Sequence, residues 1–171
     1  MDTLGNKRNV GSLKYIFDTH KDKNFTIRFL GQSAVTDLNA TFDEIIPSLA
    51  FLSPSAKQKI DIISNTDPYD FMLNVGKVDA ILPLVDGMNF HHFKGYQDGK
   101  KLSSSVTWGL GFHKKMVIYE PLANTFGIQE DNATFWLYSN YDSFAKAFGR
   151  CLEHLLETRT EIGGNDSLLF Y

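Results

Sequence analysis

Two lysines and three serines stand together in the run 100–105, Lys-Lys-Leu-Ser-Ser-Ser. A helix predicted over about 102–112 begins within this run and follows an apolar stretch and a glycine-containing loop. The first N–H groups of a helix have no partner inside it, and with the helix dipole they favour an anion. Hydroxyls add donors and lysine adds charge, so the run predicts a phosphate site, whereas the alternative interpretation is a solvated, serine-capped helix start. The candidate ligands are Lys101, Ser103, Ser104 and Ser105.

A second pair of cations, Lys7 and Arg8, follows Gly5 just before a predicted helix over 10–17. Phosphate binding is one interpretation of this loop, and a solvated basic turn is the other. Neither the dinucleotide-binding glycine motif nor the P-loop motif occurs.

The sequence gives little support for a metal site, for serine-hydrolase chemistry or for a reactive cysteine. His91 and His92 are adjacent and have no cysteine or carboxylate cluster beside them, so no metal site is predicted. Serine-hydrolase chemistry lacks its nucleophile-elbow motif. Cys151 lies on the apolar stripe of a predicted helix and is interpreted as a core residue.

The elements that position these residues alternate along the chain. Runs rich in Ile, Val and Phe predict strands at 25–30, 59–63, 78–85, 116–119 and, more weakly, 133–138. Helical spacing occurs at 10–17, 35–46, 102–112 and 142–157. A further helix is predicted to begin after Asp67 as N-cap, with Pro68 at the first helical position. We therefore predict an α/β fold: an open, mostly parallel Rossmann-like sheet of about five strands with helices on both faces. Ligands of such sheets bind beyond the carboxyl ends of the strands, here the loops 31–34, 65–67, 86–101 and 120–125.

Composition and net charge limit the classes of protein to which the chain can belong. The 171 residues carry a net charge of −3, which disfavours a nucleic-acid-binding surface, and they fit one domain over 1–171. One cysteine requires no oxidising compartment, and neither a signal peptide nor a membrane span is recognisable, so a cytoplasmic location is expected.

The order of these pieces resembles the C-terminal, donor-binding domain of retaining glycosyltransferases built from two Rossmann-like domains. The resemblance spans nearly the whole chain: a glycine and basic loop at 5–8, a helix, the strand 24–31, the helix from Tyr69, the strand 78–85, and the donor helix and following strand within 100–118.

This resemblance implies that Lys7 or Arg8 and the three serines border the diphosphate of a nucleotide sugar, and that 64–67 lies where the base binds. Asp86 would stand near the first of the family's paired glutamates. The second falls near Trp108 or Gly109, where no acid is present, and the usual proline before the next strand is also missing.

The expected function is donor binding in a hexosyltransferase, with a nucleoside-diphosphate sugar as substrate and no other cofactor. The chain would be half of a longer two-domain enzyme, weak or inactive without the missing acceptor-binding domain. A non-catalytic α/β module that binds a nucleotide or a protein remains the alternative.

Overall fold

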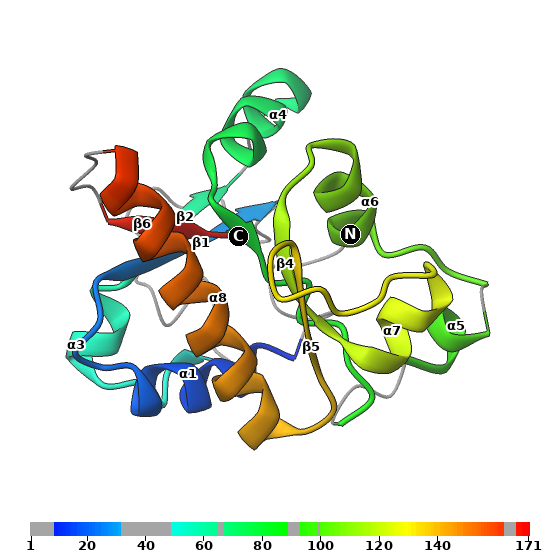
Figure 1. Cartoon of the computed structure of the whole chain (residues 1–171), viewed down its shortest axis with the longest axis horizontal. Helices are drawn as coiled ribbons and strands as arrows, with labels where there is room; N and C mark the ends of the chain where they lie inside the picture. The colour runs from blue at the N-terminus through cyan, green and yellow to red at the C-terminus, as the bar shows by residue number, and fades with distance from the viewer. Residues whose placement is uncertain (1–8, 32–48, 65–66, 89–92, 99, 163–166) are drawn as a thin grey trace.

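Six parallel strands form an open sheet in the order β2-β1-β6-β3-β4-β5, which confirms the predicted fold class (Figure 1). The computed structural model describes residues 9–31, 49–64, 67–88, 93–98, 100–162 and 167–171. The strands are β1 (Phe25–Gly31), β2 (Ile60–Ser64), β3 (Ala80–Ile81), β4 (Lys115–Tyr119), β5 (Phe135–Tyr138) and β6 (Leu168–Phe170).

Helices cover both faces of this sheet because side chains alternate along each strand. On β4, Val117 packs into one core, while Met116 and Ile118 pack into the other. The first core is covered by η1 (Val10–Ser12), α1 (Leu13–Thr19), α3 (Pro54–Lys57) and α8 (Tyr141–Ile162). The second is covered by α4 (Pro68–Lys77), α5 (Phe93–Gln97), α6 (Ser104–Gly111) and α7 (Glu120–Thr125). Figure 1 shows α1 and α8 side by side on one face.

Several predicted elements are confirmed in detail. The apolar stripe of α8 is buried, and Cys151 on it is fully enclosed, which raises the pKa of its thiol to about 12. Helix α4 begins as predicted, because the Asp67 carboxylate accepts hydrogen bonds from the N–H groups of Tyr69 and Asp70 and Pro68 occupies the first turn.

Other elements differ from the sequence-based predictions. Only Ala80 and Ile81 of the run 78–85 form a strand, since Leu84 has a positive φ of 52° and its carbonyl accepts from the Asn9 N–H outside the sheet. The segment 120–125, predicted to be a loop, is the helix α7. The sixth strand, β6, was not predicted, and it lies between β1 and β3. The predicted helix over 35–46 lies outside the described residues.

Candidate functional site

The carboxyl edge of the sheet gathers the candidate residues. All strands point the same way, so each chain segment that leaves a strand starts from this edge. Helix α6 connects β3 to the parallel strand β4 and therefore runs back towards the other edge, which places its first residues at the carboxyl edge. Val106, in its first turn, is fully buried in the core with Ile81 and Met116, which anchors the helix start.

The three serines at this helix start do not face the same way. Ser103 is the N-cap in an extended conformation, and its side chain makes no capping hydrogen bond. Its carbonyl accepts from the N–H and the hydroxyl of Thr107, at 3.0 and 3.1 Å. Ser103 and Ser105 are 2 % and 1 % exposed, whereas Ser104 is exposed.

The hydroxyls of Ser103 and Ser105 are buried and have no hydrogen-bond partner within the described chain. A buried hydroxyl without a partner costs about 1–3 kcal/mol, so native proteins rarely leave one unpaired. Two of them lie at a helix start, whose first N–H groups have no partner within the helix. We call Ser103, Ser104 and Ser105 with these N–H groups the α6 start.

Two lysines precede the α6 start, and both side chains are exposed. The Lys101 N–H donates to the carbonyl of Gly95 in α5 at 2.9 Å, which fixes the course of the chain as it enters the helix. Both lysines therefore lie directly before the α6 start in the chain.

Asp86, which follows the buried run after β3, is fully buried. The Asn9 amide donates to its two carboxylate oxygens at 2.9 and 3.1 Å, and the Met88 N–H donates to Oδ1 at 3.1 Å. The Tyr138 hydroxyl, at the end of β5, donates to Oδ2 at 3.5 Å. This carboxylate binds the segment before α1 to the carboxyl edge instead of facing solvent.

The pKa values of two tyrosines at this edge are raised above the ordinary value. Burial, followed by the nearby Asp86 carboxylate, raises the pKa of Tyr138 well above its ordinary value. The pKa of Tyr119, at the end of β4, is also raised by burial, and the Asp86 and Glu120 carboxylates act in the same direction. Both phenols therefore remain neutral hydrogen-bond donors.

The remaining predicted positions are placed only in part. Lys7 and Arg8 lie outside the described residues, as do His91 and His92. In the proposed base region Ser64 ends β2 and Asp67 caps α4; positions 65–66 are not described. Among the residues that are described, no three His, Cys, Asp or Glu side chains gather as metal ligands would.

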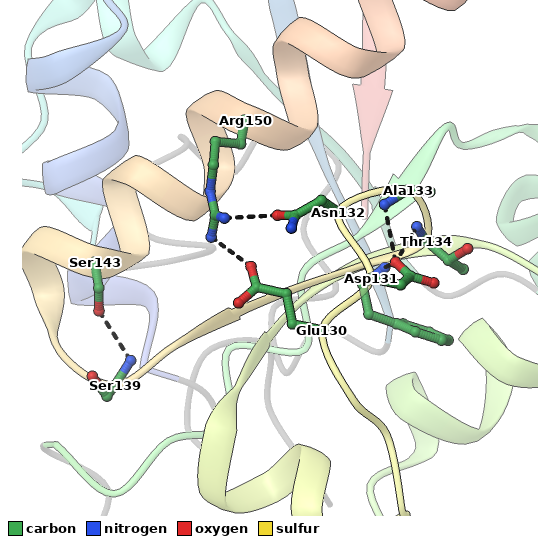
Figure 2. Close-up of polar contacts among 9 residues, drawn as sticks. Glu130, Asp131, Asn132, Ala133, Thr134, Ser139, Ser143 and Arg150 are labelled. Carbon is green, nitrogen blue, oxygen red and sulfur yellow. Dashed lines mark hydrogen bonds and ion pairs between the residues drawn. The ribbon is translucent and has the colours of Figure 1, made fainter.

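A second polar network lies away from the candidate site, around β5 (Figure 2). Oδ1 of Asp131 accepts from three successive N–H groups at the start of the strand, those of Ala133, Thr134 and Phe135. Arg150 of α8 pairs with Glu130 at 2.6 Å and donates to the Asn132 side chain at 2.7 Å. The contacts of Arg150 join α8 to the segment just before β5.

Two features of the site escaped the sequence analysis. The bond between Asn9 and Asp86 joins residues 77 positions apart, and no local pattern signals such a contact. The contact between Gly95 and Lys101 had no signal either, because the segment 86–101 was predicted to be a loop, whereas Phe93–Gln97 within it forms the helix α5.

No protein-family model matches the chain, and neither a curated protein nor a solved structure shows significant similarity to it. The described helices include none with the length and apolar character needed to cross a membrane.

Proposed function

We propose that the chain binds the diphosphate of a nucleotide sugar at the α6 start, as the donor-binding half of a two-domain glycosyltransferase. One observation carries the proposal: the buried hydroxyls of Ser103 and Ser105 have no partner within the described chain and lie at a helix start, where the first N–H groups have no partner inside the helix. Serine hydroxyls reorient by rotation about one bond, so both can turn towards an anion without a backbone change. Lys101 and Ser104 are exposed and are proposed to contact the side of the diphosphate that faces solvent.

In the transfer reaction negative charge develops on the departing diphosphate. Donors that are already fixed around it lower the barrier because they need no reorganisation as the bond breaks. The lysines and the helix N–H groups supply such donors, and Lys7 and Arg8 are proposed to add to them. The acceptor would be held by a further domain, as the resemblance to this enzyme class implies.

Binding is tested by calorimetry with UDP, GDP, ADP and a CMP derivative. Lys101→Ala and Ser104→Ala should each weaken the best ligand about ten- to hundredfold, because each removes a charge-assisted hydrogen bond worth about 1.5–3 kcal/mol. Lys77→Ala is the matched control, since Lys77 is an exposed lysine at the far end of α4. Equal affinity in all three variants would move the phosphate site elsewhere.

A non-catalytic nucleotide-binding module is the second candidate, and the burial of Asp86 favours it. The family's first glutamate meets the donor sugar, whereas the Asp86 carboxylate is enclosed and bonded to Asn9 and to the Met88 N–H. Both candidates predict diphosphate binding. They differ in turnover: a transferase half should transfer sugar once the acceptor-binding domain is supplied, whereas a binding module should not.

A transferase half should turn over very slowly alone, because the half of the cleft that holds the acceptor and excludes water would lie in the further domain. Release of nucleoside diphosphate from a donor sugar, followed by chromatography, measures this. Rapid transfer by the purified chain to a simple acceptor would contradict the two-domain proposal.

A further inference from the structure

Gly95 and Lys101 pack against each other immediately before the α6 start. A methyl group built on Gly95 would lie 3.1, 3.3 and 3.4 Å from the Cδ, Cε and Cγ atoms of Lys101. The bare backbone of α5 thus forms the surface on which three methylene groups of the lysine side chain rest. The hydrogen bond from the Lys101 N–H to the Gly95 carbonyl, at 2.9 Å, holds the two backbones together at the same point.

A glycine is costly in the middle of a helix, because it gives up more backbone freedom than any other residue. Gly95 is the third of the five residues of α5, and its φ is not in the left-handed region, so no turn geometry requires a glycine here. The feature that suits a glycine is the lysine side chain lying across it.

We infer that Gly95 is a positioning residue for diphosphate binding: it lets the Lys101 side chain lie flat on α5, so that the ammonium is held ready beside the α6 start. This inference rests on the proposed function and adds to it the residue that orders the cation. A free lysine side chain samples many rotamers and loses that freedom when it binds an anion. A lysine ordered beforehand loses less and binds more tightly.

The inference predicts that Gly95→Ala changes the affinity for pyrophosphate without lowering the stability of the fold. A purely structural role of Gly95 would not separate these two effects. Gly95→Ala should leave the melting temperature unchanged or raise it, because alanine favours the helix and the lysine tip can shift by the few tenths of an ångström required. The same variant should bind inorganic pyrophosphate about three- to tenfold more weakly, because the displaced lysine must be ordered on binding.

The experiment compares four chains by calorimetry with inorganic pyrophosphate: wild type, Gly95→Ala, Lys101→Met and the double variant. Methionine keeps an apolar chain over Gly95 and removes the ammonium. Lys101→Met should bind about ten- to hundredfold more weakly than wild type, and Gly95→Ala should cause no further loss in that background. Carbon-13 relaxation of the Lys101 ε-methylene, measured without ligand, should show greater mobility in Gly95→Ala than in wild type.

The outcomes distinguish the inference from the proposed function. No pyrophosphate binding by wild type would overturn both. Wild-type affinity in Gly95→Ala, together with weak binding in Lys101→Met, would overturn the inference alone. An equal loss from Gly95→Ala in both backgrounds would show that the glycine acts independently of the lysine, and so would an unchanged mobility of the ε-methylene; either result overturns the inference.

Discussion

The side-chain amide of Asn9 donates to both carboxylate oxygens of Asp86, at 2.9 and 3.1 Å, across 77 positions of the chain. Asn9 is 9 % exposed and Asp86 is fully buried, so water cannot replace this amide easily. The pair therefore joins the segment before α1 to the carboxyl edge of the sheet, beside the strand ends where the proposed ligand would bind.

Asn9→Ala should lower the free energy of unfolding by about 2–3 kcal/mol, because it leaves a buried carboxylate short of a donor. Urea unfolding at neutral pH measures this loss. Asn140→Ala is a matched control at an exposed asparagine, which accepts from the Ser143 N–H at the start of α8 and should lose about 1 kcal/mol. Equal losses of unfolding free energy in the two variants would show that the burial of Asp86 does not raise the cost of removing its Asn9 partner.

Two glycines of α6 should respond to alanine in opposite directions. A methyl group on Gly109 would collide with Sδ of the buried Met116 and lie 3.1 Å from its Cγ, whereas one on Gly111 would meet nothing within 4 Å. Gly109→Ala should therefore destabilise the chain by about 1–3 kcal/mol. Gly111→Ala should stabilise it by about 0.5–1 kcal/mol, because alanine favours the helix. Thermal unfolding of the two variants, with wild type between them, checks the packing of α6 on β4.

The Asp131 turn should make stability depend on acid pH. Partial desolvation raises the pKa of this carboxyl, but hydrogen bonds from the N–H groups of Phe135, Thr134 and Ala133 outweigh it and lower the pKa from 3.8 to about 2. Because the folded-state pKa is the lower one, this contribution is complete above about pH 4 and is lost as the pH falls towards 2. The melting-temperature difference between wild type and Asp131→Ala should shrink over that interval.

Asp131→Asn is the control for this titration. The amide oxygen of this variant can accept the same N–H groups, but it carries no charge and does not titrate. The melting-temperature difference between this variant and wild type should therefore also shrink as the pH falls towards 2. A carboxyl resonance of Asp131 that titrates near 3.8 would contradict the hydrogen-bonded turn.

Phe144→Ala should cost about 3–5 kcal/mol, since the ring is fully buried in the α8 core and its centroid lies 4.6 Å from that of Tyr138. Leu102→Ala is the contrasting variant, because Leu102 is 76 % exposed and its loss should change the free energy of unfolding by less than about 0.5 kcal/mol. Urea unfolding of both variants measures the contrast. Similar costs would mean that α8 does not pack as described.

Periodic burial made much of this fold predictable from the sequence. The strands β1, β2, β4 and β5 and the helices α4, α6 and α8 each carry an apolar pattern that arises from their own packing. Strand β6 is apolar as well, but it is too short to show a period. It is only Leu168–Phe170, and its strand conformation depends on pairing with Phe25–Ile27 and Ala80, far away in the sequence. Helix α7 did have a signal, since Glu120 and Pro121 suit a first helical turn.

The sequence predicted a helix start with hydrogen-bond donors, but not the direction in which each serine side chain points. The lysines and serines at 100–105 indicate a helix start with donors, and a helix does begin there. Which serines face inward depends on the exact first residue of the helix, and helix ends are poorly defined by sequence. Burial of Ser103 and Ser105 with Ser104 exposed therefore emerged only from the structure.

The place of β6 in the sheet affects how the protein can be made. Residue pairs such as Ile27 and Phe170 join the part of the sheet formed by β1 and β2 to the part formed by β3, β4 and β5. During synthesis the two parts emerge from the ribosome in turn, and their facing edges lack this central strand until residue 170 has followed. Open strand edges are prone to aggregate, and contacts this distant in sequence form slowly. The central strand is thus the last of the described strands to be made, and the two parts of the sheet can join through it only after residue 170 has left the ribosome.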